Sequence, residues 1–146
     1  MLCRLVTVGK PSLPWARAGL DDYLGRLRRQ AKVEHIAVRE GPIQQVEKQL
    51  LKASEGCRRI LLDERGTQRS SLQLAKLIEG WQLNAARHPC LIIGGADGHS
   101  DAMRASADEL WSLSAMTLQH EMAAVLLIEQ IYRAHQILAG SPYHRV

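Results

Sequence analysis

The chain has 146 residues, a formal net charge of +4 at pH 7 and no Phe, so aliphatic side chains must supply most of its core. This length fits one domain spanning residues 1–146, which can bury about 68–70% of its unfolded surface. The apolar run 122–128 is too short to cross a membrane, and the three cysteines have neither disulfide nor zinc spacing. We therefore expect a soluble, cytoplasmic protein with reduced thiols, no signal peptide and no metal. The mildly basic charge is compatible with a nucleic-acid partner.

Strands and amphipathic helices alternate in the first half of the sequence. Residues 2–8 have the pattern of a strand, and Pro14 opens a helix in which apolar residues recur at helical spacing. The alternating residues 33–38 predict a second strand. After the turn at Gly41-Pro42, apolar side chains trace a second helix, which Gly56 stops.

The second half continues this alternation. Residues 59–62 predict a short buried strand that ends in the polar turn 63–66, and a helix capped by Ser70 or Ser71 follows. The remaining predicted elements are a strand around Leu91, a glycine turn, a small Ala-rich helix, a short strand near Trp111 and a long helix over about 120–138, after which Pro142 ends the ordered structure. Strands that are apolar on both faces and alternate with helices indicate an α/β fold. We expect a mostly parallel sheet with helices on both faces.

The segment Gly94-Gly95-Ala96-Asp97-Gly98 follows an apolar strand and precedes Ser100, a candidate helix cap. Glycine lets backbone amides approach a bound small molecule closely. The segment lacks the G-x-G-x-x-G spacing of dinucleotide folds, and the sequence contains no Gly-Lys-Ser/Thr. It therefore predicts a nucleotide-like site that holds no phosphate. The polar turn 63–66 also follows a strand on this edge of the sheet, where α/β folds usually bind their ligands.

Residues 112–118 contain hydroxyl and apolar side chains and no titratable group. A catalytic serine would need a G-x-S-x-G elbow, which is absent. Two interpretations stay open: an ordinary connection into the last helix, or a loop whose backbone N–H and C=O groups hold a ligand, as in many adenine sites. His120 and His144 are both placed where they could face a cleft at the strand ends. Glu129 and Arg133 have the spacing of a structural ion pair within one helix.

Basic residues gather in the segment 26–32, at the end of the first predicted helix. Cations there suit the helix dipole, so a solvated helix end is the simplest interpretation. The alternative is an RNA-facing surface that also includes Arg4, Arg58, Arg59, Arg65, Arg69 and Arg145. The segment has no interleaved aromatic residues of the kind that bind single strands.

Three blocks of the sequence form a recognisable set. They are Leu91-Ile92-Ile93-Gly94-Gly95-Ala96-Asp97-Gly98, then Trp111-Ser112-Leu113-Ser114-Ala115-Met116-Thr117-Leu118, and finally Glu129-Gln130-Ile131-Tyr132-Arg133-Ala134 with Pro142-Tyr143-His144-Arg145. In order, spacing and position they resemble the ribosomal large subunit methyltransferase H family, small members of the SPOUT class of knotted methyltransferases. The start of the chain fits as well, with Val8-Gly9-Lys10, Trp15, and Tyr23-Leu24 followed by Arg26.

This resemblance implies a trefoil knot in the C-terminal half, which is an exception to the usual unknotted topology. It also implies a homodimer that binds S-adenosylmethionine near the subunit interface. The residues that would hold this cofactor are Leu62, Gly94, Leu113, Ser114, Ala115, Met116, Thr117, Leu118 and Gln119. S-adenosylmethionine has no phosphate, which agrees with the absence of the two phosphate-binding motifs.

The reaction that the resemblance implies is methylation of N3 of a pseudouridine in helix 69 of 23S ribosomal RNA, on the assembled 70S ribosome. The cofactor supplies the reactive methyl group, and the protein must position N3 and help to remove its proton. The tail residues Tyr143, His144 and Arg145 match the family, and we expect them to contact the substrate. Our hypothesis is that His144 or Tyr143 orients or deprotonates N3.

The chain departs from the family pattern at two places. Family members commonly have Pro-His followed four residues later by Arg, whereas this chain has Gln119, His120 and Ala124. The segment 39–46 is also short and lacks the Gly- and Lys-rich loop of many relatives. Three alternatives stay open. One is a small nucleotide-binding oxidoreductase, which the missing G-x-G-x-x-G disfavours. The others are a non-catalytic ribosome-binding relative, which Ala124 favours, and a SPOUT methyltransferase of transfer RNA.

Overall fold

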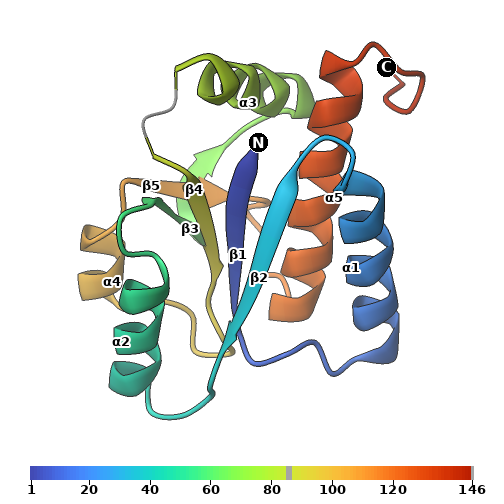
Figure 1. The fold of residues 1–146 in the computed structure, drawn as a ribbon. Coiled ribbons are helices and arrows are strands. Elements are labelled where there is room, and N and C mark those ends of the chain that lie inside the picture. The colour runs from blue at the N-terminus through green and yellow to red at the C-terminus, as the bar shows by residue number, and fades with distance from the viewer. Residues whose placement is uncertain (85–86, 146) are drawn as a thin grey trace.

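A computed structural model of the chain describes residues 1–84 and 87–145, and five strands within these ranges form one parallel sheet (Figure 1). The strands are β1 (Leu2–Val8), β2 (Lys32–Val38), β3 (Arg58–Gln68), β4 (Pro89–Ile93) and β5 (Glu109–Ser112). They lie in the order β2-β1-β4-β3-β5, and each neighbouring pair is parallel. The prediction of a mostly parallel sheet is confirmed.

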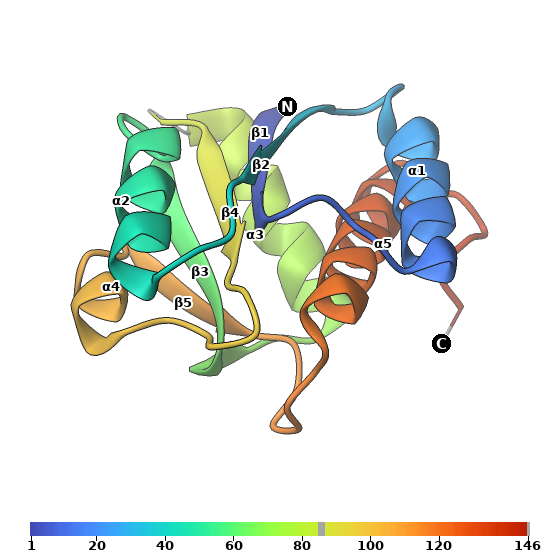
Figure 2. The same ribbon diagram turned by 90° about the horizontal axis from the view of Figure 1, so that it is seen from below.

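Helices cover both faces of the sheet, as predicted (Figure 2). One face carries α1 (Pro14–Leu27), α3 (Ser71–Asn84) and α5 (His120–Leu138), and the other carries α2 (Ile43–Ala53) and α4 (Asp101–Ala105). None of the helices among the described residues combines the length and apolar character needed to span a membrane.

Alternate residues of the central strands fill two separate apolar cores. Leu5 and Ile60 belong to the core beneath α1, α3 and α5, whereas their neighbours Val6 and Leu61 belong to the core beneath α2 and α4. Successive side chains of a strand point to opposite faces of the sheet, and here both faces are covered. The buried stretches of the central strands, such as residues 60–62 and 90–93, are therefore apolar on both faces, which is why the sequence shows them as continuous apolar runs.

The predicted helix caps are present. Ser70 Oγ accepts a hydrogen bond from the Gln73 N–H at 3.1 Å, and Gln73 Oε1 accepts one from the Ser70 N–H at 2.8 Å, which forms a capping box before α3. Ser100 caps α4 by accepting from the Met103 N–H at 3.1 Å. The side chain of Gln119 accepts from two backbone N–H groups in the first turn of α5.

The prediction that the third strand ends at Leu62 is wrong, because β3 continues to Gln68. Its pairing with β5 shifts register between Leu62 and Thr67, so the polar segment 63–66 is an irregularity inside the strand. Gly66 permits this close approach: a Cβ there would lie 2.5 Å from the Leu110 carbonyl group. The segment therefore stays within the strand instead of forming a turn that ends it.

The prediction that ordered structure ends at Pro142 is also wrong, because the tail folds back onto α5. The Tyr143 hydroxyl donates to Glu129 Oε1 at 2.9 Å, and Arg133 Nη1 donates to His144 Nδ1 at 3.2 Å. The predicted ion pair within α5 is confirmed, with Arg133 Nη2 at 2.7 Å from Glu129 Oε1. The same ion pair thus holds the tail against the helix.

Candidate functional site

A cavity of about 310 Å³ lies on the carboxyl-terminal side of the sheet, next to Leu62 of β3, Ile93 of β4 and Trp111 of β5. The glycine turn 94–98 and the loop that leads into α5 line it as well, together with the first turn of that helix. This is the edge at which open α/β sheets usually bind ligands. Three segments that are distant in sequence therefore meet at one cavity.

Of the nine residues predicted to hold a cofactor, seven line this cavity: Leu62, Gly94, Leu113, Ser114, Met116, Thr117 and Leu118. Ala115 and Gln119 are not part of its lining. Ala115 is exposed in the same loop, and Gln119 caps α5 instead. His120, which the sequence placed near a cleft, lines the cavity.

The glycine turn brings backbone directly to the cavity surface. The Gly98 N–H donates to the Gly95 carbonyl oxygen at 3.0 Å, and Gly98 has a left-handed φ of +68° that favours glycine. A Cβ on Gly94 would lie 3.1 Å from the Gly98 carbonyl group and 3.2 Å from His99 Cε1. The turn is therefore closed on itself, and Gly94 leaves its backbone open to a ligand.

The loop before α5 is held over the cavity by side-chain hydrogen bonds. Ser112 Oγ donates to the Ser114 carbonyl oxygen at 2.8 Å, and the Met116 N–H donates to Ser114 Oγ at 3.0 Å. Thr117 Oγ1 donates to Glu64 Oε2 at 2.7 Å, which links the loop to β3. Both linked residues line the cavity, so the loop and the irregular part of β3 form adjoining parts of its wall.

A buried ion pair forms another part of the wall. Arg104 Nε lies 2.7 Å from Asp63 Oδ2, and only 5% of the Asp63 side chain is exposed. Burial acts to raise the pKa of Asp63, but hydrogen bonds from the Arg65 N–H and the Arg104 guanidinium outweigh it and hold the pKa below its usual value. Asp63 is therefore ionised and bound to its partner, and it is not a free base.

His99 is a cavity residue that the sequence did not predict as a functional residue. Its ring lines the cavity and is almost fully buried. The only available sequence signal was its position directly after Gly98, and histidine at the end of a turn is usually a surface residue. Arg104 was also not predicted, because its role depends on an ion pair with Asp63 from a strand that is distant in sequence.

The structure does not bring the predicted substrate residues to the cavity of their own chain. Tyr143, His144 and Arg145 are absent from its lining, and Tyr143 and His144 contact Glu129 and Arg133 in the middle of α5. Burial raises the pKa of Tyr143, and the hydrogen bonds with Tyr23 and Glu129 act in the same direction. Tyr143 is therefore protonated at neutral pH.

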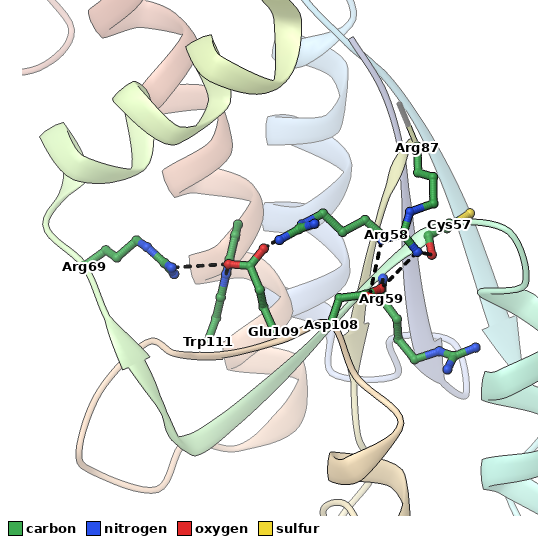
Figure 3. A network of polar contacts seen from close by, with 8 residues as sticks. All are labelled: Cys57, Arg58, Arg59, Arg69, Arg87, Asp108, Glu109 and Trp111. Atoms are coloured by element: carbon green, nitrogen blue, oxygen red, sulfur yellow. Dashed lines mark hydrogen bonds and ion pairs between the residues drawn. The ribbon is translucent and has the colours of Figure 1, made fainter. Parts of the chain in front are cut away.

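Figure 3 shows that basic residues around β5 are paired with carboxylates. Glu109 lies 2.7 Å from Arg58 Nε and 3.3 Å from Arg69 Nη2. Asp108 accepts a hydrogen bond from the Arg59 N–H at 2.7 Å and lies 3.3 Å from Arg87 Nη2. These contacts fasten the start of β5 to its neighbours in the sheet, so much of the local positive charge is already neutralised.

The arginines considered for an RNA-facing surface do not share one surface. Arg4 and Arg58 lie at the amino-terminal ends of their strands, on the edge opposite the cavity. Arg65 lies on the cavity side, 3.6 Å from Asp101. Arg28 and Arg29 are exposed at the end of α1, as a solvated helix end requires.

The described residues contain no group of three or more His, Cys, Asp or Glu side chains that could hold a metal ion. The cavity instead offers backbone groups, apolar side chains and a few fixed polar groups. Such a lining suits an uncharged heterocycle with flanking polar groups.

The chain is similar to known proteins over nearly its full length. A family model described as predicted SPOUT methyltransferase matches residues 1–144. The chain is 46% identical over 146 residues to the ribosomal RNA large subunit methyltransferase H of Deinococcus radiodurans. It is 41% identical over 145 residues to the protein of the same name from Thermus thermophilus. Each of these alignments covers 99% of both chains.

Solved structures share the arrangement of strands and helices. A probable methylase family protein from Haemophilus influenzae superposes with a TM-score of 0.59 at 9% identity, over 99% of this chain and 70% of that chain. A probable methyltransferase from Bordetella pertussis gives a TM-score of 0.55 at 13% identity, over 91% of this chain and 95% of that chain. At these identities the likeness supports the fold alone.

Proposed function

Because the chain belongs to the SPOUT methyltransferase family, we propose that it methylates 23S ribosomal RNA with S-adenosylmethionine as the methyl donor. The proposed target is N3 of a pseudouridine in helix 69, presented by the assembled 70S ribosome. The observation that carries this proposal is the cavity, at which Leu62, Gly94 and the loop 113–118 meet. The relatives named as large subunit methyltransferases support the choice of ribosomal RNA.

The cavity fits S-adenosylmethionine, which SPOUT methyltransferases use. Its volume of about 310 Å³ is at the lower end of the range of about 300–1,000 Å³ that is usual for ligand sites. Gly94 allows close approach of the backbone, and Leu62 and Leu118 offer apolar contacts to an adenine ring. When bound, the cofactor supplies an electrophilic methyl group on a sulfonium. The cavity residues would hold the cofactor and exclude water.

The hydrogen bonds of the tail residues support a role for the tail in positioning the target pseudouridine. Arg133 donates a hydrogen bond to His144 Nδ1, so a neutral His144 carries its proton on Nε2 and presents a donor there. A protonated Tyr143 is not a base, and its single O–H already donates to Glu129. We therefore refine the hypothesis: His144 orients the uracil ring by donating from Nε2 to one of its oxygen atoms, and Tyr143 holds the tail in place through Glu129. The N3 proton leaves to another acceptor. Replacement of both residues without loss of methyl transfer would contradict this role.

We propose a homodimer in which the tail of one subunit serves the cavity of the other. Tyr143 and His144 do not line the cavity of their own chain, and a second copy could bring them to it without displacing the tail from α5. Met122 and Leu126 on α5 are 37% and 39% exposed, and Leu126 lines a groove of about 320 Å³ between α3 and α5 that has both apolar and polar walls. This face gives a second copy apolar area to cover.

A small protein whose arginines are largely paired has little surface for reading an RNA sequence. Recognition of a preformed RNA shape on the ribosome would supply the substrate specificity that these side chains do not. Ala124, which replaces the family Arg, is buried in α5 and cannot contact RNA from the surface. The proposed activity must therefore proceed without a cation at this position.

The test is transfer of a labelled methyl group from S-adenosylmethionine to 70S ribosomes that lack the modification. Ribosomes with uridine in place of the helix 69 pseudouridine serve as the control. Label confined to the pseudouridine-containing ribosomes would support the cofactor, the substrate and the reaction together.

The same assay separates the alternatives. Label that appears in transfer RNA and not in ribosomes would favour a SPOUT methyltransferase of transfer RNA. Ribosome binding and cofactor binding without methyl transfer would favour a non-catalytic relative, because Ala124 removes the family cation.

A further inference from the structure

His99 is the first residue after the glycine turn, and its imidazole forms part of the cavity wall. The residue is only 6% exposed, yet neither ring nitrogen has a hydrogen-bond partner among the described residues. Buried polar groups in proteins are nearly always hydrogen-bonded. A buried ring with two unpartnered nitrogens at a cavity wall therefore points to a partner that enters the cavity.

The charged groups near this ring are already paired with other residues. Asp63 Oδ2 lies 2.7 Å from Arg104 Nε, and Glu47 Oε2 accepts a hydrogen bond from the Ser100 N–H at 2.9 Å. The Leu62 carbonyl group lies near the ring but forms no hydrogen bond of normal geometry with it. None of these nearby groups therefore forms a standard hydrogen bond with the imidazole.

The ring also stands directly behind the turn that we assign to the cofactor. A Cβ on Gly94 would lie 3.2 Å from His99 Cε1, so the ring and the Gly94 backbone are in near contact. Both residues line the same cavity. A ligand that lies against Gly94 therefore comes close to His99 Cε1, the carbon between the two ring nitrogens.

The chemistry of the ring selects the part of the ligand that it can bind. Burial lowers the pKa of His99, although the nearby carboxylates of Asp63 and Glu47 act in the opposite direction. A neutral imidazole has one N–H donor and one acceptor nitrogen. Ribose hydroxyls and the edge of adenine offer the matching uncharged groups. The carboxylate and ammonium of a methionine moiety are better matched by charged side chains.

We propose that His99 is a specificity-determining residue that hydrogen-bonds the adenosine part of S-adenosylmethionine. This proposal rests on the proposed function, because it takes the cavity as the cofactor site. In this role His99 holds the nucleoside against Gly94 and favours nucleoside-containing ligands over other sulfonium compounds.

The test is isothermal titration of the full-length protein with S-adenosylmethionine and with 5′-methylthioadenosine, which lacks the amino acid part. His99→Leu removes both polar atoms at similar size, and we expect it to weaken both ligands roughly tenfold. His99→Gln keeps a donor and an acceptor and should recover part of the affinity. His88→Leu replaces an exposed histidine and should leave both affinities unchanged.

Three outcomes would overturn the proposal. The first is a folded His99→Leu variant that binds both ligands as the parent protein does. The second is weaker binding of S-adenosylmethionine alone, which would place the contact on the methionine part. The third outcome can be measured even where His99→Leu does not fold. It is the absence of any ¹⁵N chemical-shift change at the His99 ring nitrogens when 5′-methylthioadenosine saturates the parent protein. If the parent protein binds neither ligand, the proposed function itself fails.

Discussion

Gly94 is the position at which an added side chain should prevent ligand binding in the cavity. A Cβ there would approach the Gly98 carbonyl group to 3.1 Å and His99 Cε1 to 3.2 Å, and it would stand on the surface offered to a ligand. We expect Gly94→Val to abolish binding of S-adenosylmethionine, because the larger side chain blocks close approach of the backbone. Titration calorimetry checks this. Gly25→Val is the control, since a Cβ at Gly25 meets no atom within 4 Å. Unchanged affinity in folded Gly94→Val would refute our assignment of the turn.

Glu121 should make the stability of the protein depend on pH. Its carboxylate accepts hydrogen bonds from the N–H groups of Ser12 and Leu13 at 2.6 and 3.1 Å, and from the Ser12 hydroxyl at 3.1 Å. Burial acts to raise its pKa, but these hydrogen bonds outweigh burial and hold the pKa below the ordinary value of 4.5. The folded state therefore binds a proton less readily than the unfolded state. The stabilisation is complete above the ordinary pKa and is lost as pH falls through the lower, folded-state pKa.

The matching experiment is urea unfolding of Glu121→Gln at pH 7 and at pH 3. At pH 7 the variant should lose about 1–3 kcal/mol of unfolding free energy, the usual cost of losing hydrogen bonds to a charged group. At pH 3 the difference from the parent protein should shrink, because the parent carboxyl is then becoming protonated as well. An equal difference at both values would show that ionisation of Glu121 does not contribute.

The sequence predicts the part of the site that depends on local features. Gly94 and the loop 113–118 stand in recognisable blocks, and both line the cavity. His99 and Arg104 could not be predicted in the same way. The burial of His99 depends on neighbours from β3 and α2, and the partner of Arg104 is Asp63, 41 residues away in sequence. Side-chain roles that come from long-range packing leave no local pattern.

Among the elements, β3 approaches β5 so closely at Gly66 that only glycine fits there. A Cβ on Gly66 would lie 2.5–2.6 Å from backbone atoms of Leu110 and Trp111, which are part of β5. Backbone atoms cannot yield as a flexible side chain can. We therefore expect Gly66→Ala to destabilise the protein by about 1–3 kcal/mol, as overpacked substitutions do.

Gly80→Ala in α3 is the matched control for Gly66→Ala. A Cβ at Gly80 meets nothing within 4 Å, so alanine should stabilise this helix by about 0.5–1 kcal/mol. Both changes are measured by denaturant unfolding. Equal stability of Gly66→Ala and the parent protein would show that β3 and β5 can separate without cost at this point.

The same strand shows where element prediction succeeds and where it fails. The apolar segment up to Leu62 is recognisable because both of its faces are buried. Residues 63–68 are polar and mostly exposed, and they have neither an apolar run nor an alternating pattern. Their strand conformation comes from pairing with β5 after the register shift, which is a property of the sheet. The five helices predicted from spacing and caps lie where the sequence placed them, within the described residues.

At the scale of the whole molecule, the two groups of residues assigned to catalysis lie apart in one chain. The cavity is at the carboxyl-terminal side of the sheet, and the tail packs against the middle of α5. The trefoil knot that the family resemblance implies stays a prediction, and so does the homodimer. Dimer formation is the simpler way to bring tail and cavity together, because it requires no rearrangement of the ion pair between Glu129 and Arg133.

This arrangement predicts that two inactive variants restore activity when they share a dimer. Gly94→Val removes the cofactor site, and the double change Tyr143→Phe with His144→Ala removes the hydroxyl that holds the tail and the imidazole that donates from it, so each homodimer should be inactive. If each active site combines the cavity of one subunit with the tail of the other, a mixed dimer keeps one intact pair of cavity and tail. In a two-fold symmetric dimer with random exchange, half of the dimers are mixed and each has one working site, so about a quarter of the parent activity should return. The measurement is methyl transfer to 70S ribosomes after the two variants are unfolded and refolded together, with each variant refolded alone as the control. If cavity and tail act within one chain, a mixed dimer has no intact pair, and the mixture should stay as inactive as its components.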